Sequence, residues 1–191
     1  MRFVRAAVPA LLVALVTTWP VSAYAGVLVH RDPVGDMARS PVGTNAYLPA
    51  ANQVHGDITA TRVVHARRAI WIQIRLRELD TTGNGNFHLV SIRTPWRTRN
   101  VEVDAFPGHW EGTASVTDAR GRPVACAVTH RIDYDRNRVM MRVPRACLGT
   151  PRWIQVGIRT TVAGTLYVYA DDARSTGLGP ALRYGRRIPV G

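Results

Sequence analysis

Apolar and polar residues alternate one by one along much of this 191-residue chain. Residues 69–79 show it best, with four apolar side chains on one side of an extended backbone and polar, charged or aromatic ones on the other: Ile70, Ile72, Ile74 and Leu76 against Trp71, Gln73, Arg75 and Arg77. A period of two is typical of a strand with one buried face. Such segments recur about every ten residues, separated by Gly, Pro, Asn and Asp, and no convincing amphipathic helix occurs. The sequence therefore predicts an all-β fold: a single antiparallel β-sandwich, jelly-roll-like, of about nine or ten strands.

Two segments fit this pattern less well. Residues 37–54 are predicted to form mainly an irregular loop, because Pro41, Gly43 and Pro49 interrupt them. Residues 181–190 could add an edge strand near the end of the chain.

A β-hairpin is predicted between residues 124–134 and residues 139–143, which both alternate. If Arg136–Asn137 is a two-residue loop, Ile132 lies opposite Met141.

The same register places Cys126 opposite Cys147, the chain's two cysteines, and predicts a disulfide between them. Pro144 cannot donate to a ladder, so a short helical turn after it would shift the pairing yet leave the sulfurs within reach. The bond would close a loop of about 20 residues and contribute roughly 3 kcal/mol of stability. The alternative is two unpaired buried thiols.

The first 25 residues have the pattern of a secretory signal peptide. Arg2 and Arg5 precede an apolar run over residues 6–16, and Ala23-Tyr24-Ala25 fits a small-x-small cleavage site. The sequence thus predicts a secreted protein, with residues 26–191 as one domain and no membrane span after removal of the signal; a retained anchor is the alternative. Export also permits the disulfide, since it forms in oxidising compartments.

All 25 basic residues are arginine, and the formal net charge is +12. Guanidinium groups pair bidentately with carboxylate, phosphate or sulfate, so a polysaccharide or an anionic cell-wall polymer is the expected partner. The arginines are spread over nearly every predicted strand, which does not indicate a dedicated nucleic-acid site. Nothing in the sequence predicts an oligomeric state.

Three short motifs carry a resemblance to known proteins. Asp-Pro-x-Gly-Asp spans residues 32–36, Gly56-Asp57-Ile58 begins a predicted strand, and residues 144–153 read Pro-Arg-x-Cys-Leu-Gly-x-Pro-Arg-Trp. The layout resembles small exported β-sandwich proteins of high-GC bacteria, a group largely without assigned function. The opening Asp-Pro-x-Gly-Asp segment and the order of the predicted strands also resemble carbohydrate-binding modules of family 9 and DOMON-like sandwiches. In these, aromatic platforms bind sugars or a pocket holds haem or sugar, which implies a ligand-binding sandwich here.

Four aspartates are candidate ligands for Ca²⁺: Asp32, Asp36, Asp171 and Asp172. The first and last strands of a sandwich often neighbour each other, which would bring these carboxylates together, and Ca²⁺ prefers oxygen ligands. Asp32 and Asp36 are equally well explained as turn residues that bind local backbone amides.

Three aromatic residues are candidate ligand-binding positions because alternation places them on outward faces: Trp71, Tyr167 and Tyr169. A flat ring suits the apolar face of a sugar, although such rings also serve to cover a sandwich.

No catalytic motif is present, and no catalytic residue is assigned. The first hypothesis is a secreted, non-catalytic binding protein for a carbohydrate or an anionic envelope polymer. The second is a protein-interaction or envelope-structural protein. An extracellular hydrolase is the third, and Glu102 or Glu111 with Asp104 would be an example of its carboxylate pair.

Overall fold

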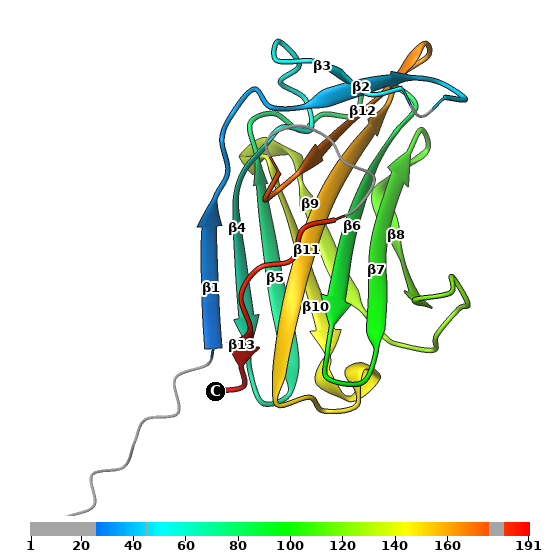
Figure 1. The fold of residues 1–191 in the computed structure, drawn as a ribbon. Helices are drawn as coiled ribbons and strands as arrows, with labels where there is room; N and C mark the ends of the chain where they lie inside the picture. Colours follow the sequence, from blue (N-terminus) through cyan, green and yellow to red (C-terminus); the bar gives the residue numbers. More distant parts are fainter. Residues whose placement is uncertain (1–25, 45, 176–181) are drawn as a thin grey trace, which may run out of the picture.

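The computed structural model describes residues 26–44, 46–175 and 182–191. Two antiparallel sheets pack face to face, so the prediction of an all-β sandwich is confirmed (Figure 1). The predicted signal peptide, residues 1–25, lies outside the described residues. Within the described ranges, no helix has both the length and the apolar character needed to cross a membrane.

The first sheet has five strands. In spatial order they are β1 (Gly26–Arg31), β4 (Ile58–His65), β5 (Ala69–Leu76), β10 (Arg138–Pro144) and β9 (Thr129–Asp133). Every neighbouring pair runs antiparallel.

The second sheet has eight strands. Seven follow one another as β3 (Leu48–Pro49), β2 (Ala38–Pro41), β12 (Tyr167–Asp172), β11 (Trp153–Ala163), β6 (Gly85–Arg93), β7 (Thr98–Phe106) and β8 (His109–Asp118). The eighth, β13 (Ile188–Pro189), pairs with the start of β11. In Figure 1, β2 and β3 lie across the top of the sandwich, and β13 lies near its base beside β1.

The described part of the chain thus has thirteen strands, more than the nine or ten predicted. Residues 37–54 were expected to form an irregular loop, yet they contain β2 and β3. These strands have only four and two residues, and Pro41 and Pro49 end them. Such short, proline-bounded strands at one end of the sheet give no alternation long enough for a sequence pattern to reveal.

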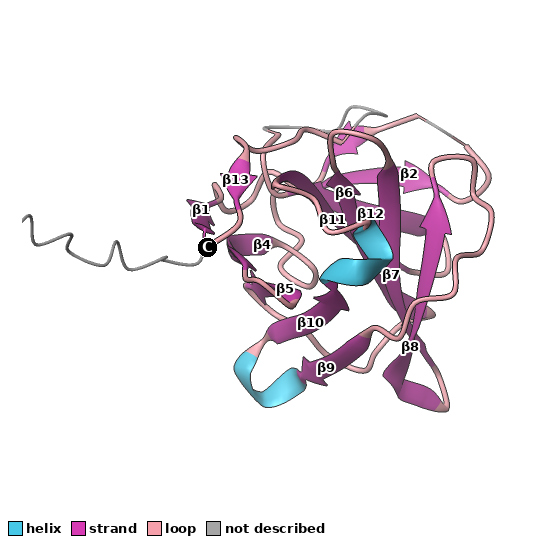
Figure 2. Cartoon of the chain, turned by 90° about the horizontal axis from the view of Figure 1, so that it is seen from below, coloured by secondary structure: helices cyan, strands magenta, loops and turns pink. Residues whose placement is uncertain are grey.

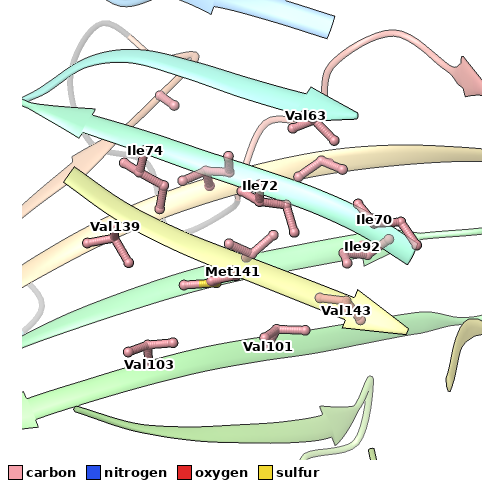
Figure 3. Close-up of a cluster of buried hydrophobic side chains, with 14 of the residues drawn as sticks. Val63, Ile70, Ile72, Ile74, Ile92, Val101, Val103, Val139, Met141 and Val143 are labelled. Carbon is pink, nitrogen blue, oxygen red and sulfur yellow. The ribbon is translucent and has the colours of Figure 1, made fainter. Parts of the chain in front are cut away.

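The core lies between the two sheets and is built from the inward half of each alternating strand. Ile70, Ile72 and Ile74 of β5 face the second sheet, where Ile92 of β6 and Val101 of β7 meet them (Figure 3). All of these side chains are almost completely buried. Burial of apolar area of this kind is the main force that holds a sandwich together.

A hairpin of β9 and β10 exists, but its first strand is only Thr129–Asp133 and not the predicted residues 124–134, and its register differs by two residues. Val139, not Met141, lies opposite Ile132. The connection is longer than the two residues expected, because Tyr134–Arg136 form a 3-10 turn, η1, that ends at Asn137 in the left-handed conformation. Asp133 caps this turn by accepting the backbone N–H of Arg136 at 3.2 Å.

The disulfide between Cys126 and Cys147 is confirmed. Cys126 precedes β9 and Cys147 lies in the 3-10 turn η2 (Arg145–Leu148), so the bond joins two irregular segments instead of two paired strands. Figure 2 shows both turns, one joining β9 to β10 and one after β10. The structure therefore has the short helical turn after Pro144 that the sequence analysis considered as the alternative to direct strand pairing.

Candidate binding groove and carboxylate cluster

A shallow groove of about 490 Å³ lies on the outer face of the five-stranded sheet. Its side chains come from two neighbouring cross-strand rows over β4, β5, β10 and β9. The first row is Val64, Trp71, Arg142 and Thr129, and the second is Arg62, Gln73, Met140 and Arg131. Each strand contributes alternate residues, so the period that buries the isoleucines also builds this outer surface.

Trp71 is the aromatic centre of the groove. Its side chain is outward, as the alternation predicts, and the residue is 51% exposed. The guanidinium carbon of Arg142, directly across the strand pair, lies 5.5 Å from the centre of the indole ring. This cation–π contact holds a positive charge beside a flat apolar face that is open to solvent.

Arginines also flank the second row. Arg62 and Arg131 stand at its two ends, with Gln73 and the half-buried Met140 between them. Arg131 lies 3.8 Å from Asp133, whereas neither Arg62 nor Arg142 has an acidic partner among the described residues. The groove therefore combines an apolar floor, an exposed indole and guanidinium groups free to pair with an anion.

The other two predicted aromatic residues lie elsewhere. Tyr167 and Tyr169 belong to β12 of the eight-stranded sheet, with ring centres 6.3 Å apart. Arg39 stacks on Tyr167 at 4.8 Å. Because Trp71 belongs to the other sheet, the three aromatics do not form one platform.

Three of the four predicted metal-binding aspartates come together. Asp32 and Asp36 lie in the segment between β1 and β2, and Asp171 lies in β12. One carboxylate oxygen from each lies within 4.8 Å of the others. The first and last parts of the domain do meet here, because β12 pairs with β2.

Asp172 does not join this group. Its carboxylate accepts hydrogen bonds from Nε of Arg159 at 3.3 Å and from Nη2 at 2.9 Å. Adjacent residues of a strand point to opposite faces, so Asp171 and Asp172 could not both face one site.

Asp57, which precedes β4, is the carboxylate that the sequence analysis did not assign. It is fully buried beside the other three, and its Oδ2 accepts the backbone N–H of Gly35 at 2.9 Å. Arg77 lies 3.5 Å from the same oxygen. The only sequence signal was its place in the Gly56-Asp57-Ile58 strand start, which marks a turn equally well.

Burial and mutual repulsion perturb the protonation of this cluster. Burial, followed by the charges of Asp171, Asp36 and Asp57, raises the pKa of Asp32 to about 8. Burial raises the pKa of Asp171 to about 7, although the N–H of Ile58 donates to it at 2.6 Å. The pKa of Asp36 is also raised, chiefly by burial. These carboxylates are therefore difficult to ionise together without a compensating cation.

No protein-family model, curated protein or solved structure matches this chain. Its function must be inferred from the two sites themselves.

The carboxylates of the hydrolase hypothesis lie on the eight-stranded sheet. Glu102 and Asp104 are alternate residues of β7, and burial raises the pKa of both. Glu111, in contrast, is exposed and lies 3.6 Å from His109.

Proposed function

We propose that this protein is an exported, non-catalytic binding protein whose groove around Trp71 holds a carbohydrate polymer bearing anionic groups. The observation that carries the proposal is the exposed indole of Trp71 with the guanidinium of Arg142 beside it. A sugar ring can stack its apolar face on the indole while its acidic substituent pairs with the guanidinium.

The charge of the molecule supports an anionic ligand over a neutral one. The chain carries a formal net charge of +12, and Arg62 extends the positive surface along the groove. A field of this sign raises the local concentration of polyanions and speeds their association.

Export is part of the same proposal. It is supported by the signal-like pattern of residues 1–25 and by the disulfide between Cys126 and Cys147, a bond that persists in oxidising compartments. The polymers that such a protein meets are those of the cell envelope and its surroundings.

The first test is calorimetric titration with a carboxylated oligosaccharide, an oligogalacturonate, at low salt and with EGTA present. A neutral oligosaccharide and polyphosphate serve as comparison ligands. We expect Trp71→Ala to weaken oligogalacturonate binding at least tenfold, about 1.4 kcal/mol, because the stacking surface is lost. Trp96→Ala is the matched control, since Trp96 is 62% exposed but lies in the loop between β6 and β7.

The arginine contribution has its own control. Arg142→Gln should weaken binding and reduce its salt dependence, whereas Arg120→Gln, on an exposed turn after β8, should change neither. Equal binding of wild type and Trp71→Ala would contradict the proposal. Tight binding of polyphosphate alone would show that charge, and no sugar, is recognised.

A further inference from the structure

We infer that the carboxylates of Asp32, Asp36 and Asp171, with Asp57 beside them, form a Ca²⁺ site that joins the two sheets. This inference does not depend on the groove or on its ligand. It rests on where the four residues lie, on the state of their oxygen atoms and on the ligand preference of Ca²⁺.

The site lies where the chain first crosses from one sheet to the other. The segment between β1 and β2 carries Asp32 and Asp36, and it is fixed to the first sheet by the N–H of Asp32, which donates to Thr59 at 3.1 Å. Asp171 approaches from the second sheet and accepts the N–H of Ile58, at the start of β4. A cation held here would therefore connect both layers of the sandwich.

The carboxylate oxygens are the second, independent observation. Six of them are buried without a hydrogen-bond donor: both oxygens of Asp32, both of Asp36, Oδ1 of Asp57 and Oδ1 of Asp171. The Asp32 side chain is 0% exposed, and its nearest basic group, Nε2 of His30, lies 3.5 Å from Oδ1. Buried polar atoms are normally satisfied, so a group of six without donors in one place requires a partner.

The donor set selects the type of cation. The three clustered ligands are all carboxylates, with no cysteine or histidine among them, which favours a hard cation over zinc or copper. Ca²⁺ takes six to eight oxygens in flexible geometry, whereas Mg²⁺ demands a near-ideal octahedron and keeps several waters. Arg77 beside Asp57 and Arg174 near Asp32 offset only part of the negative charge.

The decisive experiment compares thermal melts of the purified protein, dialysed against EGTA, at pH 8 with and without 1 mM CaCl₂. A ligand that binds only the folded state raises the midpoint by mass action. We expect a rise of several degrees with Ca²⁺, a smaller one with MgCl₂, and one Ca²⁺ per chain by calorimetric titration. No rise with CaCl₂ and no calorimetric binding would overturn the inference.

Isosteric variants locate the site. Asp36→Asn and Asp32→Asn should each lose the Ca²⁺-dependent rise, and without Ca²⁺ Asp32→Asn should melt at or above the wild type because one repelling charge is gone. Asp135→Asn, at an exposed acid in η1, is the matched control and should keep the full rise. A rise that persists in the Asp32 and Asp36 variants would place the cation elsewhere and refute the assignment; wild-type calorimetry decides the question even if a variant does not fold.

Discussion

At the scale of single residues, the buried histidine His88 is held in its uncharged form by its surroundings. Its Nδ1 lies 3.2 Å from the hydroxyl oxygen of Thr160, and its Nε2 has no hydrogen-bond partner among the described residues. Burial, with a smaller contribution from the charge of His55, lowers the pKa of His88 to about 3. Nothing in the local sequence pattern marks which of the six histidines is enclosed.

We predict that His88 makes the fold sensitive to acid. The unfolded chain takes up a proton on this histidine below about pH 6.5, while the folded chain does not until about pH 3. Between these pH values unfolding takes up a proton, so the free energy of unfolding falls as the pH falls. His88 contributes about 1.4 kcal/mol of this loss per pH unit. His88→Gln keeps a polar side chain next to Thr160 but cannot take up the proton.

Urea denaturation at pH 7, 6 and 5 measures the effect. The variant should lose less stability over this range than the wild type, by about 1.4 kcal/mol per unit below pH 6.5. The aspartate cluster contributes equally to both proteins, so it cancels in the comparison. Parallel pH profiles for the two proteins would show that His88 does not titrate in this way.

At the scale of the element, alternation identified the long strands correctly and failed at the connections. The isoleucines of β5 and the valines of β10 fall on the buried face as their spacing predicts. The pairing register of β9 and β10 was not predicted correctly, because the register of a hairpin depends on the length of its loop. Here Asp133 and Asn137 build a longer loop than the two residues assumed. Such caps depend on local side-chain hydrogen bonds, and the alternation of apolar and polar residues carries no information about them.

Asn137 is the residue that fixes this turn. It has φ 49° and ψ 52°, and its Oδ1 accepts the backbone N–H of Leu79 at 2.9 Å. We predict that Asn137→Gly costs about 1 kcal/mol, for the lost hydrogen bond. Asn137→Ala should cost about 2 kcal/mol, since alanine also strains the left-handed backbone.

Chemical denaturation of the two variants measures which substitution lowers the free energy of unfolding more. Glycine serves as the control that tolerates the left-handed conformation. If alanine proved no more destabilising than glycine, backbone conformation would not be what Asn137 supplies at this turn.

At the scale of the whole molecule, sequence reasoning gave the sandwich and the disulfide but not the order of strands. Cross-strand neighbours such as Trp71 and Arg142 are separated by more than a third of the chain, and no spacing rule brings them together. For the same reason, the spacing of the aspartates in the sequence could not predict which of them meet. The meeting of Asp32 and Asp36 with Asp171 follows from β12 pairing with β2, while Asp57 reaches the group through the neighbouring sheet. Periodicity assigns a residue to a face, and topology alone decides which faces share a site.

We propose that the face around Trp71 binds an anionic glycan. The most direct test is a ¹H–¹⁵N spectrum of the tryptophan indole groups during titration with oligogalacturonate. Residues 26–191 contain four tryptophans, Trp71, Trp96, Trp110 and Trp153, so each indole signal reports on a different place. We predict that the Trp71 indole signal moves furthest and that the Trp96 signal stays in place. A shift centred on Trp96, or no shift of any indole at saturating ligand, would show that the face around Trp71 does not bind the glycan.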